Sequence, residues 1–224
     1  MKVEFYRRNL PHYIVPGFPY FVCINLIGTM PKTKIIEILT DGSPMERLRI
    51  LPVLAAAGIS VGEIILRPDP KRIIQKIQAE FLGPRWLAIP KVADAVKEAI
   101  LHRDGEIYDL FAFSIMPSHV HLLFRLPGDI SEGKSSANDE PTDKFQLAKI
   151  IGNLKKYTAR QANLILGRRG PFWEHESYDH VVRNRKELIR LVRYTLMNPV
   201  RAGLAKTPDE YPWNYVNLEL VSSQ

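Results

Sequence analysis

The chain has 224 residues, of which 46% are hydrophobic and 25% are charged, the composition of an ordinary folded protein. Its single cysteine, Cys23, excludes an intrachain disulfide framework and any cysteine-rich zinc site. No apolar run reaches the roughly 18 residues that span a membrane, and residues 1–8 lack the apolar core of a signal peptide. We therefore expect a cytoplasmic protein with no membrane partner.

The charged residues are distributed unevenly along the chain. The formal net charge is +7, and the segment from Lys144 to Lys206 holds 14 lysines and arginines against 4 acidic residues. In the rest of the chain, acidic residues outnumber basic ones. Such a local excess favours a polyanionic partner such as nucleic acid, although a basic helix face that meets only water would give the same count.

The first confidently predicted element is a strand over residues 20–27, whose nearly continuous apolar run indicates a central strand covered on both faces. Helices are predicted over residues 31–39 and again from Ser43, which is placed to cap the second helix. Residues 59–67 fit either a strand or an irregular segment. The spacing of the apolar residues in 70–82 predicts another helix.

A further helix over residues 90–102 is followed by a strand over 107–115 and, after a bend, by a second strand. A strand, a tight bend and a strand together favour an antiparallel pair. We expect one domain over residues 1–224, with a helical insertion at roughly 31–103 and a flexible loop at 127–143.

Two histidines lie one residue apart in the apolar run that follows Pro117. In a strand, side chains alternate between the two faces, so His119 and His121 point the same way while Val120 points into the opposite face. Two imidazoles side by side can supply two nitrogen ligands to one metal ion. A His-x-His pair is more often structural, so a metal site needs a third ligand and a reacting group from elsewhere.

A long helix is predicted over residues 144–166, after the flexible loop, and it carries much of the basic excess. A short extended segment follows over residues 178–183. We expect the basic side chains of this region to bind nucleic acid, and the candidates are Lys155, Lys156, Arg160, Arg168, Arg169, Arg183 and Arg185.

The last predicted helix begins after Asn184, which fits an N-cap, with Glu187 in the position of a capping box. Pro199 is expected to stop this helix near Asn198. On a helical wheel, Glu187, Tyr194 and Asn198 line up along one edge of the apolar stripe. That stripe consists of Leu188, Ile189, Leu191, Val192, Thr195 and Leu196.

A phenol, an amide and two imidazoles together suggest a definite chemistry. A phenol has a pKa near 10 and is a weak nucleophile, but it can attack a phosphodiester when a metal ion polarises the phosphate. Two imidazoles and an amide oxygen suit Mg²⁺ or Mn²⁺ with open positions for phosphate oxygens. Taken alone, Tyr194 is more often a packing residue and Asn198 more often an ordinary residue near a helix end.

The chain resembles the single-tyrosine HUH transposases, in particular the branch of REP-associated tyrosine transposases. The resemblance spans most of the chain in family order. It rests on residues 116–123 (Met-Pro-Ser-His-Val-His-Leu-Leu), 155–160 (Lys-Lys-Tyr-Thr-Ala-Arg), 170–179 (Gly-Pro-Phe-Trp-Glu-His-Glu-Ser-Tyr-Asp) and 194–204 (Tyr-Thr-Leu-Met-Asn-Pro-Val-Arg-Ala-Gly-Leu), and residues 7–12 (Arg-Arg-Asn-Leu-Pro-His) also fit.

This resemblance implies an α+β fold, a ferredoxin-like antiparallel sheet with helices packed on it and the histidine pair on a central strand. It places the family nucleophile at Tyr194 and the third metal ligand at Asn198, beside His119 and His121. Tyr157 is the rival tyrosine. The family acts on single-stranded DNA, often near hairpins of repeated palindromes in bacterial chromosomes, which implies DNA as partner, a divalent metal as cofactor and a place near the nucleoid.

Two departures from the family pattern stand out. Ser118 occupies a position where the family usually has asparagine, next to the histidines. The usual tryptophan-proline-tryptophan-serine ending is replaced here by Tyr211-Pro212-Trp213-Asn214, and residues 35–81 carry little signature.

Two other functions stay open at this point. One is a hydrolase whose metal activates water, which would want further ligands of the His-x-His-x-Asp-His kind, where Leu122 and Leu123 stand instead. The other is a domesticated relative that binds DNA without cleaving it. The sequence does not decide between a monomer and a homodimer.

Overall fold

A computed structural model describes residues 4–7, 11–14, 17–56, 59, 73, 81–126 and 146–223. The loop expected at 127–143, the segment at 59–67 apart from Ile59, and most of the helix expected at 70–82 lie outside these residues. Within the described part of the chain, none of the helices is long and apolar enough to cross a membrane.

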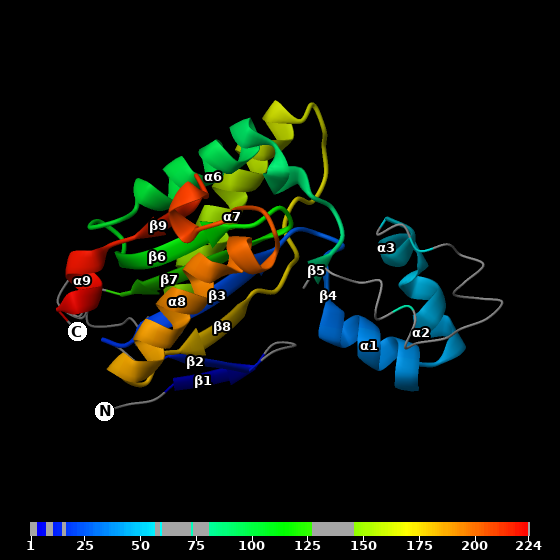
Figure 1. Ribbon diagram of the computed structural model, residues 1–224, viewed down its shortest axis with the longest axis horizontal. Coiled ribbons are helices and arrows are strands. Elements are labelled where there is room, and N and C mark those ends of the chain that lie inside the picture. Colours follow the sequence, from blue (N-terminus) through cyan, green and yellow to red (C-terminus); the bar gives the residue numbers. More distant parts are fainter. Residues whose placement is uncertain are drawn as a thin grey trace, which may run out of the picture.

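The centre of the fold is a five-stranded antiparallel sheet with the order β8-β3-β7-β6-β9 (Figure 1). The first four of these strands are β3 (Pro19–Asn25), β6 (Asp109–Ile115), β7 (His119–Arg125) and β8 (Tyr178–Val181). Helix α6 (Pro90–Leu101) connects β3 to β6, and helix α7 (Gln146–Ile165) connects β7 to β8. This β-α-β-β-α-β order with interleaved strands is the ferredoxin-like arrangement, so the predicted fold class is confirmed.

One face of the sheet packs against α6 and α7, which lie together on that side (Figure 1). Val22, Val120, Leu122 and Phe124 point into this core and are at most 1% exposed. Helix α6 buries the apolar stripe expected from its sequence, Val92, Ala93, Val96, Ala99 and Ile100. Val120 thus occupies the face opposite the histidines, as the alternation predicted.

The other face of the sheet packs against helix α8 (Arg185–Arg201) and the short C-terminal helix α9 (Leu218–Ser222). A register shift between Leu110 and Ala112 places Phe111 and Ala112 on this same face. Helix α8 buries four residues of its predicted stripe, Leu188, Leu191, Val192 and Thr195. Ile189 is 47% exposed, so its place in the stripe was wrong.

Helix α8 does not stop at Asn198 as predicted. It continues through Pro199 to Arg201. Proline removes one backbone donor and crowds the carbonyl four residues earlier, and one turn from the helix end this costs a single hydrogen bond. The carbonyls of Asn198 and Pro199 still accept hydrogen bonds from the N–H groups of Ala202 and Leu204. Asn198 therefore lies within a hydrogen-bonded turn of the helix rather than at a frayed end.

A second unit lies beside the main body and is joined to it by the two-stranded pair β4 (Met30–Pro31) and β5 (Phe81–Leu82) (Figure 1). It contains α1 (Lys32–Asp41), α2 (Pro44–Arg49) and α3 (Leu51–Ala56). We call this unit the helical lobe. Its buried residues form their own cluster, Ile35, Ile38, Leu39, Ile50, Leu54, Ile59, Ile73 and Leu82. Helix α6 fell within the range expected for the insertion, but it packs on the main sheet.

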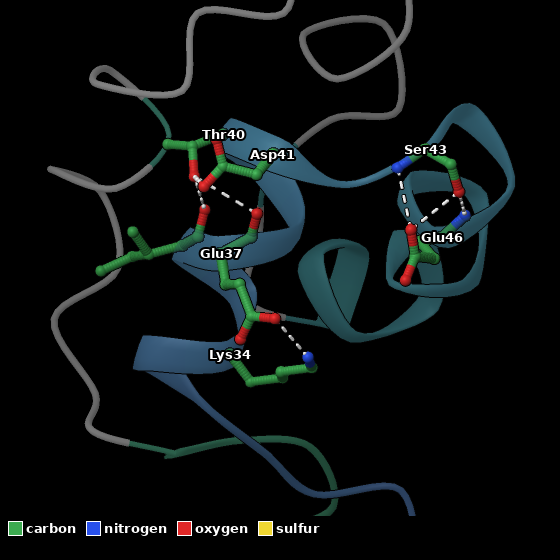
Figure 2. A network of polar contacts seen from close by, with 7 residues as sticks. Lys34, Glu37, Thr40, Asp41, Ser43 and Glu46 are labelled. Atoms are coloured by element: carbon green, nitrogen blue, oxygen red, sulfur yellow. Dashed lines mark hydrogen bonds and ion pairs between the residues drawn. The ribbon is translucent and has the colours of Figure 1, made fainter.

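Local polar contacts in α1 and at the start of α2 stabilise these two helices of the helical lobe (Figure 2). Ser43 caps α2 as predicted, and the Glu46 carboxylate accepts a hydrogen bond from the Ser43 backbone N–H, which completes a capping box. These contacts lower the pKa of the Glu46 carboxyl. At the base of the lobe, a Cβ on Gly83 would lie 2.7 Å from the Gly28 carbonyl oxygen, so only glycine fits where the two connecting chains approach.

The remaining short elements complete the fold. β1 (Glu4–Arg7) and β2 (Pro11–Ile14) form an antiparallel hairpin, and β9 (Asn214–Val216) pairs with β6. Single turns of 3-10 helix lie at Trp86–Ala88 and Pro208–Glu210. The Tyr211 hydroxyl donates to the Ile115 carbonyl, and the Trp213 indole donates to Asp94. These contacts fasten the unusual C-terminal motif to β6 and α6, and burial raises the pKa of the Tyr211 phenol to about 12.

Candidate active site

A row of side chains crosses the α8 face of the sheet at the level of His121. In the strand register, His121 lies opposite Cys23 on β3 and opposite Ser114 on β6. Cys23 in turn lies opposite Tyr178 on β8. Directly opposed residues of antiparallel strands place their side chains on one face. The next row holds His119 and its partner Asn25. Strand register thus places Cys23, Asn25, Ser114 and Tyr178 on the same face as the histidines.

The two histidines converge as their spacing predicted. The Nε2 atoms of His119 and His121 lie 3.1 Å apart, and the side chains are 3% and 2% exposed. Burial lowers the pKa of the His121 imidazole to about 3. Burial, and then the neighbouring His121, hold the pKa of His119 well below its usual range. Both rings are therefore neutral near pH 7 and each keeps one nitrogen lone pair for a ligand bond.

Asn198 adds a third polar group to this pair. It lies on α8, is 3% exposed, and its side-chain amide is 3.0 Å from Nε2 of His121. Rotating the amide by 180° would present its oxygen at the same place, since the two ends are nearly the same shape. Among the described residues, no third histidine, cysteine or acidic side chain joins the cluster. The third donor is thus the neutral amide.

The spacing of these donor atoms fits a six-coordinate ion. Two ligands at right angles on an ion about 2.1 Å away lie about 3.0 Å apart. The 3.1 Å and 3.0 Å separations are close to that value. The chemistry also fits, because two imidazoles and an amide oxygen suit Mg²⁺ or Mn²⁺. These three ligands are neutral, so the positive charge of the ion remains for anionic ligands to balance. His119, His121 and Asn198 can therefore hold a divalent metal.

Ser118 makes the contact that orients one of the histidines. Its Oγ is 3.2 Å from Nδ1 of His119, and Ser118 is 6% exposed. When Nδ1 donates this hydrogen bond, the ring keeps its lone pair on Nε2, the nitrogen that faces His121. Nδ1 of His121 is buried without a hydrogen-bond partner among the described residues. The sequence singled out Ser118 only as a departure from the family.

The turn that carries Ser118 is also held by both chains that lead to the helical lobe. The Leu26 N–H and the Thr29 hydroxyl donate to the Ser118 carbonyl, at 2.9 and 3.4 Å. On the returning chain, the Leu87 N–H donates to the Pro117 carbonyl at 3.1 Å. The connection between lobe and sheet therefore braces the first metal-ligand candidate.

Tyr194 lies one helical turn before Asn198 and on the same side of α8. Its ring centroid is 5.4 Å from that of His121 and 6.0 Å from that of Phe21. Tyr157, the rival, lies on α7, which packs on the opposite face of the sheet. Its ring is 49% exposed and contacts Arg103. Of the two tyrosines that the sequence proposed, the structure brings only Tyr194 to the histidines.

A third tyrosine shares the site face; it belongs to the motif at 170–179 but was not predicted as a site residue. Tyr178 begins β8 and is 51% exposed. It lies one strand beyond Cys23 and two strands from His121. Partial burial, reinforced by Asp179, Cys23 and Glu187, raises the pKa of its phenol. No local pattern indicates this residue, because the face on which it lies depends on the register of β8.

Glu187 lies on the predicted edge of α8 but serves the helix start. Asn184 caps α8 as expected by accepting from the Glu187 N–H. The Glu187 carboxylate accepts from the Arg183 N–H rather than from the capping residue, so the expected capping box is wrong in detail. It also lies 2.9 Å from Nε2 of His180. The hydrogen bond from the Arg183 N–H is the largest cause that lowers the pKa of Glu187. Burial opposes it, and the hydrogen bond with His180 lowers the pKa further.

The basic residues proposed for DNA binding do not share one surface. Lys155, Lys156 and Arg160 lie on α7, behind the sheet as seen from the histidines. Arg183 and Arg185 flank the start of α8 and are exposed, as are Lys156, Arg160 and Arg169. The ammonium of Lys155 donates to the His175 carbonyl. The guanidinium of Arg168 donates to Asn163 and Pro171 and lies 3.9 Å from the Trp86 ring centroid.

Comparison with known proteins agrees with the motifs. One curated protein of Haemophilus influenzae, named as a REP-associated tyrosine transposase, aligns with this chain at 25% identity over 116 residues. The chain resembles the REP-associated tyrosine transposases. The alignment covers 48% of this chain and 58% of that protein, so the chain spans less than two thirds of the relative's length.

A similar solved structure aligns with more of the chain. It is described as a REP-associated tyrosine transposase bound to a REP hairpin, and the alignment covers 93% of this chain and 80% of that one. The identity is 16% and the TM-score is 0.45. A comparison with protein-family models gives no match.

Proposed function

We propose that this protein is a metal-dependent endonuclease and strand transferase for single-stranded DNA, a transposase whose cleavage passes through a 5′-phosphotyrosine. The observation that carries the proposal is the convergence of His119, His121 and Asn198, with the ring of Tyr194 beside them. The resemblance to a REP-associated tyrosine transposase supports it independently.

The reaction requires one bond to form and one to break. The Tyr194 oxygen attacks the phosphorus of a phosphodiester and loses its proton, the bond from phosphorus to the 3′-oxygen breaks, and that oxygen takes up a proton. The protein keeps the 5′-phosphate on Tyr194 and releases a free 3′-hydroxyl. Because the phosphodiester energy is conserved in the phenolic ester, a 3′-hydroxyl can reverse the step and rejoin DNA.

The residues of the site divide this work. His119, His121 and Asn198 would hold Mg²⁺ or Mn²⁺, which when bound polarises the phosphate and stabilises the charge that develops on it. Packing of α8 on the sheet fixes the Tyr194 ring relative to those ligands. Ser118 holds His119 in the tautomer that keeps a lone pair on Nε2 for the metal.

The substrate class follows from charge and from the relatives. Exposed basic residues on α7 and at the start of α8 would bind the phosphate backbone of DNA. A palindromic repeat hairpin is the proposed target, because the relative's name refers to REP elements. A place near the bacterial nucleoid and a monomer or homodimer are the corresponding expectations.

The test uses a labelled single-stranded DNA hairpin with Mn²⁺, analysed on a denaturing gel. We expect cleavage and a protein–DNA adduct that survives denaturation and maps by mass spectrometry to the peptide holding Tyr194. Tyr194→Phe keeps the ring and its packing but removes the attacking oxygen, so cleavage falls by about three orders of magnitude or more while DNA affinity stays the same.

The matched controls are Tyr178→Phe and Tyr157→Phe, which remove the other two candidate hydroxyls and should leave the adduct intact. An adduct on either of those residues would show that the nucleophile is wrongly assigned. Cleavage without any adduct would favour a hydrolase in which metal-bound water attacks. Binding without cleavage would favour a domesticated DNA-binding protein.

A further inference from the structure

Helix α8 presents a third polar group on the edge that carries Tyr194 and Asn198. Arg201, its last residue, follows Tyr194 by seven positions and Asn198 by three. Residues separated by three, four and seven positions lie on one side of an α-helix. The edge therefore carries, in order, a phenol, an amide and a guanidinium.

The Arg201 side chain runs back along this edge. Its guanidinium carbon lies 5.8 Å from the centroid of the Tyr194 ring. Seven residues of α-helix rise about 10.5 Å, so the side chain must extend toward the helix start, past the turn that carries Asn198. The cation thus lies over the ring of the proposed nucleophile.

The Arg201 guanidinium has no competing anion in the described part of the chain. Its contact with Tyr194 is accompanied there by no hydrogen bond or ion pair, and the residue is exposed. Two other arginines are already paired with acidic residues. Arg125 is paired with Asp109, and Arg190 is paired with Glu187. Arg201 therefore keeps its donors available for a ligand that reaches Tyr194.

We propose that Arg201 binds a non-bridging oxygen of the phosphate that Tyr194 attacks. A guanidinium presents N–H donors in a planar fork that matches two phosphate oxygens, and it stacks on aromatic rings. As the phosphorus becomes five-coordinate, negative charge grows on its non-bridging oxygens, and a fixed cation stabilises that state more than the ground state. Arg201 moves no proton; it keeps its charge throughout.

This inference rests on the proposed function and names a further catalytic residue for it. The position also explains why the cation is an arginine at a helix end. The C-terminal end of a helix carries a partial negative charge, so a cation there is favoured even before DNA binds. A lysine would keep the charge but lose the planar fork.

The experiment compares Arg201→Ala, Arg201→Lys and Arg193→Ala on the hairpin substrate with Mn²⁺. Arg193 is the matched control, because it is exposed, lies on the same helix beside Tyr194 and belongs to no proposed site. We expect Arg201→Ala to slow single-turnover adduct formation by about 10²–10³-fold, as removal of one transition-state donor does elsewhere. Arg201→Lys should recover part of this rate, and Arg193→Ala should match the wild type.

A substrate with a methylphosphonate at the scissile position identifies the contact itself. Replacing the non-bridging oxygen that faces Arg201 with a methyl group removes the same interaction, so one of the two stereoisomers should be cleaved equally slowly by wild type and by Arg201→Ala. Melting temperature, Mn²⁺ affinity and affinity for uncleaved hairpin should not change in Arg201→Ala.

The outcomes separate the two proposals. If the wild type forms the adduct and Arg201→Ala forms it at the same rate, the role of Arg201 is overturned and the proposed function still stands. A loss of Mn²⁺ affinity or of stability as large as the loss of rate shows a structural role and also overturns it. A wild-type protein that forms no adduct overturns the proposed function, and the role of Arg201 with it.

Discussion

The two faces of the central sheet are built from alternate residues of the same strands, yet they are made of different chemistry. Toward α6 and α7, β7 presents Val120, Leu122 and Phe124, all at most 1% exposed. Toward α8, the same strand presents His119, His121 and Leu123, and the two histidines are buried to nearly the same extent as the apolar residues. Between His119 and Leu122, a displacement of one residue along β7 exchanges one chemistry for the other.

Burial has opposite consequences on the two faces. An apolar side chain moved out of water contributes about 1.5–3 kcal/mol to stability. A buried imidazole with an unpaired nitrogen costs free energy instead, and Nδ1 of His121 is such an atom among the described residues. Apolar residues stabilise the fold on both faces, but on the α8 face part of that stability is given up at the two histidines, where polar groups are held together without water.

The largest effect should come from His121→Ala. This change removes one of three converging donors, and we expect cleavage of hairpin DNA to fall by about 10³-fold or more, since the metal would lose a ligand and its position. Isothermal titration should show weaker Mn²⁺ binding. Affinity for single-stranded DNA should change little, because no proposed DNA-binding residue touches His121.

Leu122→Ala is the control on the other face of the same strand. It should lower the free energy of unfolding by about 2–5 kcal/mol through the cavity it leaves, while the folded protein keeps its rate of cleavage. Equal losses of DNA binding and cleavage in His121→Ala, with the fold intact by circular dichroism, would contradict a metal role.

A smaller effect is expected from Ser118→Ala. Loss of the hydroxyl removes this hydrogen bond from Nδ1 of His119, so the ring can rotate or take the tautomer with the proton on Nε2. We expect Mn²⁺ affinity to fall by about 10–100-fold, as for other residues that orient metal ligands. Isothermal titration measures this directly.

Ser118→Asn provides the matched comparison, because the family usually has asparagine there and its amide can also accept from Nδ1. It should bind Mn²⁺ about as well as the wild type. Unchanged affinity in Ser118→Ala would mean that packing alone orients His119.

The pH dependence of stability should distinguish the faces as well. The pKa values of His119 and His121 are lowered by burial, to about 3 for His121, from an unfolded value near 6.5. Below about pH 6.5 these two histidines bind protons in the unfolded chain but not in the folded chain, so the free energy of unfolding falls as the pH falls. The slope should reach about 1.4 kcal/mol per pH unit for each histidine.

Urea unfolding of the metal-free protein between pH 7 and pH 5 tests this expectation. The double substitution His119→Asn and His121→Asn removes the two titrating groups and leaves every other histidine in place. The variant should lose less stability over this range than the wild type. Parallel curves for the two proteins would show that the buried rings do not control acid sensitivity.

The sequence predicted those features that depend on local periodicity. Alternation in β7 placed His119 and His121 on one face, and the helical repeat placed Tyr194 and Asn198 one turn apart on one edge of α8. Only the family resemblance indicated that this edge meets the histidines. The cap at Asn184 was also readable, since an N-cap is a contact between residues three apart. In each case the residues that cooperate belong to one element and share its geometry.

Other features depend on contacts that local patterns do not record. Tyr178 faces the site because of its pairing with Cys23. Strand β9 pairs with β6, and the Tyr215 ring stacks on the Phe113 ring. The path of α8 through Pro199 reflects the tertiary packing of its last turn. The contact between Ser118 and His119 depends on a side-chain rotamer, which no sequence spacing specifies.

The smallest expected effect tells which face of the sheet carries the DNA. The proposed phosphate-binding residues lie on both sides, Lys156 and Arg160 on α7 and Arg183 and Arg185 at the start of α8. Removing one side chain that binds a phosphate should reduce the slope of log affinity against log salt by about 0.7 for single-stranded DNA. A double alanine substitution on the face that binds DNA should therefore reduce this slope by roughly one unit or more.

We expect the pair Arg183 and Arg185 to give the larger reduction, because α8 also carries Tyr194 and the DNA must pass that residue to be cleaved. Fluorescence anisotropy with a labelled hairpin at several salt concentrations measures the slope for each double variant. The pair on α7 is the matched control, with the same charge removed from the opposite face. An equal reduction by both pairs would mean that the DNA wraps around the sheet, and a slope insensitive to either pair would remove both surfaces from the proposed binding site.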